Sequence, residues 1–249
     1  MQGEASRLAD RESRDSFAAK LRESGNDAWE IGNELFTITY VFDHNPRIPR
    51  ALTDPGRPTE DKVALLNNLL GKQALPLTME ILTDLVGRSW SRAGDIDNAI
   101  EDFAVDAMMY QADDEKKTLK VSVQLAQAAE FCGVQSQSAD QSALLNLPVV
   151  RSDLSDSQGP LNVRYELLHA LIDGADFDRI TVRLAEHCTR NPRNRRYLES
   201  VQWLINKFSR HMGESMVTVT TATPLKKEQI KRLVEVYSAK VGRQVHINS

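Results

Sequence analysis

The chain has 249 residues, of which 41% are hydrophobic and 27% charged, and these proportions are those of an ordinary globular protein. Its formal net charge of -4 argues against a general nucleic-acid binder, because such a protein needs a basic surface. Cys132 and Cys188 are the only cysteines, so neither a disulfide framework nor a zinc site is expected. The sequence also contains no run of about 18 apolar residues that could span a membrane.

Helical periodicity dominates the first half of the chain. Between Ala28 and Phe42, apolar residues recur every three or four positions and therefore share one helical face. Pro46 predicts the end of this helix, and residues 54–58 are typical of a turn. Thr59 suits the N-cap of the next helix. Further helices are predicted over residues 78–89 and 95–109.

The pattern changes near Leu119. Apolar and polar residues alternate from Leu119 to Leu125, which predicts a β-strand. Residues 133–140 are rich in Gln and Ser and are typical of a linker. Helical patterning then returns from Ser142 to about Met212.

A shift of 102 residues aligns part of the chain with itself. The matching positions are Pro46, Leu52, Asp54, Pro58, Leu65, Leu66 and Leu69 with Pro148, Leu154, Asp156, Pro160, Leu167, Leu168 and Leu171. Farther on, Ile81 and Leu85 correspond to Ile180 and Leu184, and residues 121–126 correspond to 217–222. Amphipathic helices can resemble one another by chance, but the shared order of turn residues favours an internal duplication.

The last 34 residues predict a strand, a helix and a second strand. Residues 216–222 are β-branched and alternating, as in a strand. Thr223 and Pro224 suit a helix start, and Gly242 suits its end. Residues 244–247 form the second strand, which we expect to be parallel to the first.

This order of elements resembles the delta subunit of bacterial F-type ATP synthases, whose mitochondrial relative is the oligomycin-sensitivity-conferring protein (OSCP). The family has a valine-rich strand ending in alanine, a Pro-Leu helix start, an early Glu-Gln and a glycine before the next strand. The matching residues here are 217–222, Pro224-Leu225, Glu228-Gln229, Gly242 and 245–247. The resemblance covers most of residues 28–111 and 144–249.

Two features set the chain apart from the common bacterial form. The sequence before the signature is longer, as in the long actinobacterial type of delta subunit. The family continues after the second strand with further strands and a helix, whereas this chain stops at Ser249. Since small sheets need three or more strands for stability, we expect the chain to be truncated at its C-terminus.

Residues that could carry chemistry are scattered. Gly213-Glu214-Ser215 begins like the nucleophile turn of a serine hydrolase, but it precedes a predicted strand instead of following one. His187-Cys188 has no ligand partners at metal spacing and is expected on a half-buried helix face. No Gly-rich phosphate loop is present. We therefore expect no catalytic, cofactor-binding or metal-binding residues.

The strongest charge feature is a basic cluster, which consists of Arg190, Arg193, Arg195 and Arg196, with Lys207 and Arg210 beyond. It is either a solvated helical hinge or a contact for acidic residues of a partner. The tryptophans Trp29, Trp90 and Trp203 are expected in the core. Phe17 and Leu21 lie on the first amphipathic helix and could belong to the core or to a groove for a partner.

The sequence therefore predicts a mainly α fold, with helical bundle domains that contain an internal duplication and a small, incomplete α/β element at the end. Four regions are expected. They are an N-terminal helical domain (1–112), a strand and linker (113–141), a second helical unit (142–213) and a partial C-terminal α/β domain (214–249).

The resemblance implies a non-catalytic stator subunit of the peripheral stalk, which works in proton-driven ATP synthesis without being an enzyme itself. Its helical N-terminal domain would bind the N-terminal segment of an alpha subunit and the beta subunits of the catalytic head. Its C-terminal domain would hold the b subunit. It would lie at the cytoplasmic face of the cell membrane through the complex, without cofactor, nucleic acid or membrane insertion. A helical adaptor of an unrelated complex and an enzyme of an unknown helical class are the alternatives.

Overall fold

A computed structural model describes residues 3–71, 73–130, 154, 156, 159–172, 174–190, 192–213, 215–218, 227–241 and 245–248. The chain divides into two compact units, unit 1 (Met1–Asp114) and unit 2 (Glu115–Ser249). Both are mainly helical. None of the helices in the described ranges combines the length and the apolar character needed to cross a membrane.

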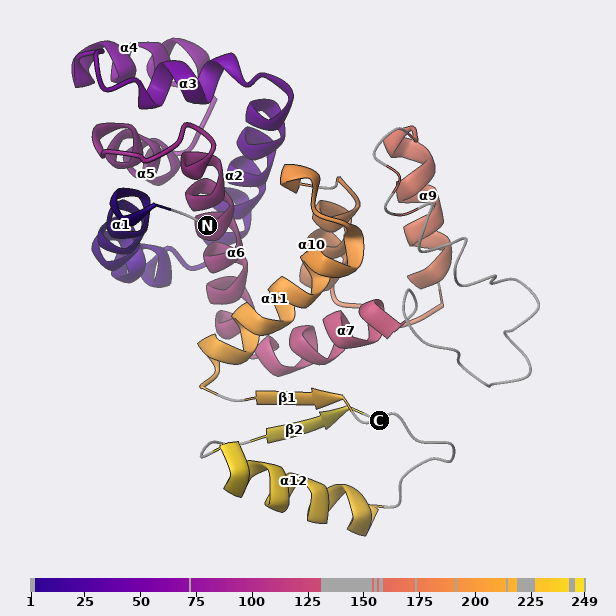
Figure 1. Cartoon of the computed structure of the whole chain (residues 1–249). Helices are drawn as coiled ribbons and strands as arrows, with labels where there is room; N and C mark the ends of the chain where they lie inside the picture. Colours follow the sequence, from indigo (N-terminus) through magenta and orange to yellow (C-terminus); the bar gives the residue numbers. More distant parts are fainter. Residues whose placement is uncertain are drawn as a thin grey trace. The chain divides into compact units, whose positions relative to one another are not determined.

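Unit 1 is a bundle of helices (Figure 1). They are α1 (Glu4–Glu23), α2 (Asp27–His44), α3 (Arg47–Thr53), α4 (Thr59–Leu70), α5 (Pro76–Gly87) and α6 (Asp95–Asp114). The central helix is α6, which packs against α1, α2 and α5 and is buried over most of its length. The helices predicted around residues 28–42, 59–70, 78–89 and 95–109 are confirmed.

The contact between α2 and α6 is the most extensive in unit 1. Ile31, Leu35 and Phe42 of α2 are buried, as the helical periodicity predicts. Gly32 allows the two helices to approach closely, because a Cβ atom at this position would lie 2.7 Å from Met108 Cε. A larger residue at Gly32 would displace the end of the Met108 side chain and would crowd the carbonyl of Ala104, which lies 3.2 Å from the same Cβ position.

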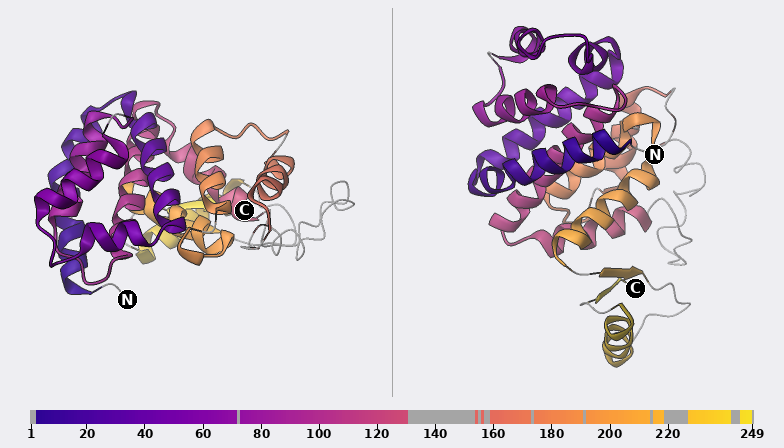
Figure 2. Two further views of the ribbon diagram at one scale, coloured as in Figure 1. Left: turned by 90° about the horizontal axis from the view of Figure 1, so that it is seen from above. Right: turned by 60° about the vertical axis from the view of Figure 1, so that its left-hand side comes forward.

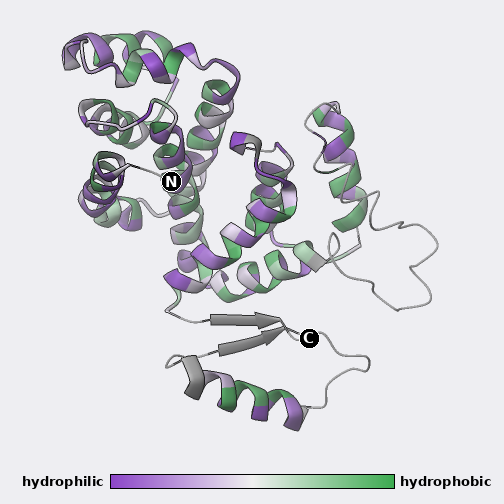
Figure 3. Ribbon diagram, viewed as in Figure 1, coloured by the Kyte–Doolittle hydropathy of each residue, from purple (hydrophilic) through white to green (hydrophobic). Residues whose placement is uncertain are grey.

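Unit 2 contains helices and one short sheet. The elements are α7 (Thr118–Glu130), α9 (Leu161–Ile172), α10 (Arg179–Thr189), the 3-10 helix η1 (Pro192–Asn194), α11 (Tyr197–His211), β1 (Ser215–Thr218), α12 (Lys227–Val241) and β2 (Val245–Asn248). Helix α11 packs along α7, and α10 packs against α7, α9 and α11. Figure 3 shows hydrophobic and hydrophilic residues alternating around the helices of both units, which is the pattern of amphipathic helices.

The strands β1 and β2 are parallel neighbours, with Ser215 opposite Val245 and Thr218 opposite Asn248. Helix α12 joins them in sequence order and packs against β2 (Figures 1 and 2). Each strand has four residues, so this element is a minor part of a mainly helical chain.

The predicted strand at Leu119–Leu125 is wrong, because these residues belong to helix α7. Val121 and Leu125 are fully buried, whereas Leu119 is 43% exposed. The spacing of four residues between Val121 and Leu125 places both on one helical face, together with Ala128. The alternation over seven residues was thus compatible with either period. In the predicted repeat, residues 121–126 match 217–222, but the first set lies in helix α7 and the second set begins in strand β1. The predicted linker at 133–140 lies outside the described residues.

Candidate functional site

Helix α1 lies against α5 and α6 through a narrow stripe. Its buried residues are Ser6, Ala9, Ser13, Phe17 and Leu21. The first three are small and let α1 approach its neighbours closely. The ring of Phe17 meets the ring of Phe103 edge to face, with 6.2 Å between the centroids. Phe17 and Leu21, 8% and 1% exposed, therefore belong to the core of unit 1.

Polar contacts reinforce this stripe on both neighbouring helices. Ser6 Oγ donates to Asp95 (2.8 Å), Ser13 Oγ donates to Asp84 (2.5 Å), Lys20 Nζ donates to Glu80 (2.5 Å) and Arg14 Nε donates to Asp106 (2.8 Å). We call the four acids Glu80, Asp84, Asp95 and Asp106 the α1 seat. A further ion pair joins Arg88 of α5 to Glu12 of α1 at 2.7 Å. The helix α1 is thus fixed by acids that α5 and α6 supply.

The strongest of these contacts joins Arg14 and Asp106. Two parallel bonds form, from Nε to Oδ2 at 2.8 Å and from Nη2 to Oδ1 at 3.0 Å. Burial by itself lowers the pKa of Arg14, but the negative charges of Asp106, Asp102 and Asp10 outweigh it and raise the pKa above its ordinary value. Arg14 therefore stays charged, and the bidentate geometry fixes its orientation.

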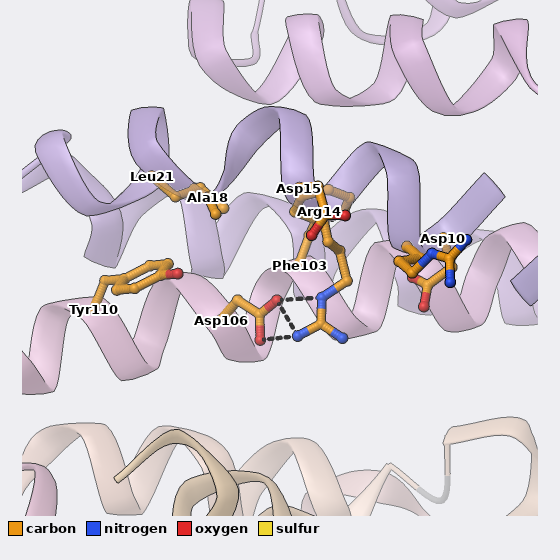
Figure 4. A pocket seen from close by; sticks show the side chains of 9 residues that line it. Asp10, Arg14, Asp15, Ala18, Leu21, Phe103, Asp106 and Tyr110 are labelled. Atoms are coloured by element: carbon orange, nitrogen blue, oxygen red, sulfur yellow. Dashed lines mark hydrogen bonds and ion pairs between the residues drawn. The ribbon is translucent and has the colours of Figure 1, made fainter. Parts of the chain in front are cut away.

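A hollow of about 250 Å³ opens beside this ion pair. The lining residues come from α1 and α6 and are Asp10, Arg11, Arg14, Asp15, Ala18, Leu21, Phe103, Asp106 and Tyr110 (Figure 4). Apolar groups lie next to a fixed ion pair in this hollow.

Apolar side chains also point outward from unit 1. Leu8 of α1 is 45% exposed and lies one turn before Glu12, which pairs with Arg88 of α5. Leu69 of α4 is 42% exposed on another helix of the same unit. Single exposed leucines are common, so neither defines a site alone.

The predicted basic cluster lies in unit 2, where α10 connects to α11. Two cations lie over the ring of Trp203, with Arg195 Cζ at 4.6 Å and Lys207 Nζ at 5.1 Å from its centroid. Arg193 has a φ of 52°, which is uncommon for a residue other than glycine. Arg190 stacks on Tyr165 of α9 at 5.9 Å. Arg196 and Arg210 are exposed whereas Lys207 is buried, so the cluster includes both solvated and packed side chains, and its role as a hinge or as a contact for a partner stays a prediction.

Sequence analysis missed one member of this cluster, Arg183 of α10. Burial lowers its pKa, and the positive charge of Arg190 lowers it further. Arg183 and Arg190 are seven residues apart and share a helical face. This spacing was the signal that could have identified Arg183.

The remaining candidate residues contribute to packing. Trp29, Trp90 and Trp203 are half-buried and not fully within the core as expected. Trp90 Nε1 donates to the carbonyl of Leu85 at 2.8 Å. His187 and Cys188 are buried, at 3% and 0% exposure, which is deeper than the expected half-buried face. Within the described ranges, no group of three His, Cys, Asp or Glu side chains could hold a metal ion.

The two units carry opposite charge. Unit 1 has 12 Lys and Arg residues against 21 Asp and Glu residues, a net charge of -9. Unit 2 has 19 against 14, a net charge of +5. Opposite net charges of this size would steer the two units toward partners of different charge.

Comparison with known proteins gives the family. The model of the ATP synthase delta (OSCP) subunit matches residues 124–249. An ATP synthase subunit delta from Bifidobacterium animalis subsp. lactis is 90% identical over 249 residues, which are 100% of this chain and 86% of that protein. The subunit delta of Bifidobacterium adolescentis is 65% identical over the same shares. That of Streptomyces avermitilis is 27% identical over 98% of this chain and 85% of its own length.

These matches define a subunit of a larger assembly. The chain belongs to the ATP synthase delta (OSCP) subunit family, a family of peripheral-stalk subunits.

Proposed function

We propose that this chain is a stator that ties the catalytic head of an ATP synthase to its peripheral stalk. Unit 1 binds the N-terminal segment of an alpha subunit and the beta subunits of the head, and residues 214–249 hold the end of the b subunit. The chain makes and breaks no covalent bond itself. It acts at the cytoplasmic face of the membrane, where the complex holds it.

The observation that carries the proposal is 90% identity to a subunit delta over the whole of this chain. The division into two compact units supports it, because a link needs two separate binding regions. The predicted regions 1–112, 113–141, 142–213 and 214–249 stay part of the proposal, with a helix in place of the strand in the second region.

A stator must bind tightly and stiffly, because it resists torque. Unit 1 offers a stiff surface in α1, since its contacts to α5 and α6 hold it from Ser6 to Lys20, over about four turns. A helix of the head that lies along α1 and α5 would cover Leu8 and meet the pair Arg88–Glu12. An interface of standard size buries roughly 800 Å² on each partner.

The test compares two exposed leucines of unit 1. In the full chain, Leu8→Asp places a charge on α1 beside α5, and Leu69→Asp places the same charge on α4, which serves as the matched control. Affinity for a purified alpha-beta head is measured by sedimentation or calorimetry. We expect Leu8→Asp to weaken binding at least tenfold and Leu69→Asp to leave it within twofold.

Circular dichroism should show the same helical content in both variants, because both leucines are exposed. Failure of the unaltered chain to bind the head would contradict the proposed function. Equal weakening by both variants would contradict the assignment of the contact to α1.

A further inference from the structure

The two units of the chain are joined by one short turn. Helix α6 ends at Asp114, the last residue of unit 1, and α7 begins at Thr118 in unit 2. The chain passes from one unit to the other only here, and residues 115–117 form the turn between the two helices. Whether this turn is a free hinge or a fixed one therefore governs how independently the units move.

The backbone of this turn has an uncommon conformation. Its middle residue, Lys116, has a φ of 57°, in the left-handed region that residues with a side chain rarely adopt. The turn between α1 and α2 has the same length, and its middle residue, Gly25, has a φ of 56°. Glycine adopts this conformation without steric cost, whereas lysine keeps it where neighbouring contacts impose it. Contacts on either side of Lys116 should therefore hold the turn.

Ion pairs from both neighbours of Lys116 attach the turn to the start of α10. Arg179 Nη2 donates to Glu115 at 2.6 Å, and Lys117 Nζ donates to Glu115 at 2.5 Å. Lys117 Nζ also lies 3.0 Å from Asp178 Oδ2. We call Glu115, Lys117, Asp178 and Arg179 the junction lock. These four charges form one connected network, which holds its geometry better than isolated surface pairs do.

Asp178 is the fixed point of the junction lock. Its side chain is only 5% exposed, and its Oδ1 accepts the backbone N–H of Ile180 at 3.0 Å. Its own backbone N–H donates to Gln124 Oε1 at 2.9 Å. Hydrogen bonds to Glu115 and Asp178 raise the pKa of Lys117 above its ordinary value, so Lys117 stays charged at neutral pH. The turn is thus bound to a buried carboxylate that α7 and α10 hold in place.

We infer that the junction lock makes the turn at 115–117 a closed hinge, and that opening the lock lets the two units move independently. Lys117 and Arg179 have side chains that are 39% and 54% exposed, so salt reaches the cations of the lock and weakens it. The inference concerns the chain by itself and does not depend on the proposed function. In a stator, a closed hinge would keep the link stiff under torque.

The spread of distances between the two units of the full chain tests the inference. Spin labels are attached through genetically encoded keto residues at position 69 of α4 and position 163 of α9, where the natural side chains are exposed. Double electron–electron resonance then gives the width of the distance distribution. The lock variant is Lys117→Gln with Arg179→Gln. The matched control, Lys120→Gln with Arg210→Gln, removes two exposed cations of unit 2 outside the lock.

We expect the distribution of the lock variant to be at least twofold broader than that of the unaltered chain, and the control to leave the width unchanged. Circular dichroism should show the same helical content in all samples, because the substituted cations are not buried. Equal widths in the lock variant and the unaltered chain would overturn the inference. Equal broadening by the control would overturn it as well.

Salt provides a second readout on the same samples. An increase from about 0.05 M to about 1 M salt shortens the Debye length to about 3 Å. This increase should broaden the distribution of the unaltered chain and leave that of the lock variant as it is. An unaltered chain that does not respond to salt would contradict a lock made of exposed cations.

Lys116→Gly separates the lock from the stiffness of the backbone. While the lock is intact, the ion pairs hold the turn, so this substitution alone should leave the width unchanged. In the lock variant it should broaden the distribution further, because glycine has the larger backbone freedom. Broadening by Lys116→Gly alone to the width of the lock variant would assign the stiffness to the backbone and contradict the junction lock.

Discussion

In units 1 and 2, a side chain on one helix accepts the same pair of hydrogen bonds at the N-terminus of another helix, but the side chain differs. Each such contact is called a helix clamp. In unit 1 the clamp residue is Glu34, which only accepts hydrogen bonds, from Leu75 and Thr78. In unit 2 it is Gln124, which also donates from Nε2 to the carbonyl of Asp176 at 2.6 Å. The clamp keeps its position in both units, whereas its side chain is a carboxylate in unit 1 and an amide in unit 2. The geometry of helix docking is therefore shared by the two units, and the polar group that achieves it differs.

The largest expected change in unfolding free energy comes from removing a buried aromatic ring from the core of either unit. Phe36→Ala removes a fully buried ring from α2, and Phe208→Ala removes one from α11. Each should cost about 3–5 kcal/mol of unfolding free energy, because truncation of a buried aromatic leaves a cavity. Hydrogen exchange with mass spectrometry should show faster exchange first in the unit that carries the substitution. Equal acceleration in both units by each variant would contradict two separate cores.

Exchange of amide for carboxylate in one clamp, and of carboxylate for amide in the other, should lower the unfolding free energy by different amounts. Gln124→Glu removes the donor to Asp176 and places a carboxylate beside a carbonyl oxygen in a buried site, so it should cost about 2–3 kcal/mol. Glu34→Gln keeps an acceptor for Leu75 and Thr78 and should cost about 0.5–1.5 kcal/mol. Urea unfolding measures both values. The comparison of the clamps is wrong if the two costs are equal or their order is reversed.

The smallest effect concerns α7. Leu119 is an exposed helix residue, so Leu119→Ala should change the unfolding free energy by less than about 0.5 kcal/mol, since alanine has the best helix propensity. In a β-strand the same change would destabilise the protein. Urea unfolding with Leu119→Gly as a control, expected to cost about 1 kcal/mol, would detect the difference. A loss of about 1 kcal/mol or more for alanine would contradict the exposed helix position.

Local periodicity and turn residues were sufficient to predict most helices, and the specific C-terminal signature was sufficient to identify the family. The helix from Ala28 to Phe42 has an unbroken period of three to four. Thr59 was predicted as an N-cap and is instead the first residue of α4, because Pro58 occupies the N-cap position. Alternation between Leu119 and Leu125 was too short to distinguish the two periods, and packing against α11 decided for a helix. The α1 seat could not be predicted, because its acids meet Ser6, Ser13, Arg14 and Lys20 only after folding brings distant segments together.

The central claim is that one chain holds the head and the stalk at the same time. Native mass spectrometry of a mixture of the purified alpha-beta head, the full chain and the soluble part of the b subunit tests it directly. The stator function predicts a single assembly that contains all three. Binding of the head and of the b subunit that is mutually exclusive, or no assembly that contains this chain, would contradict it.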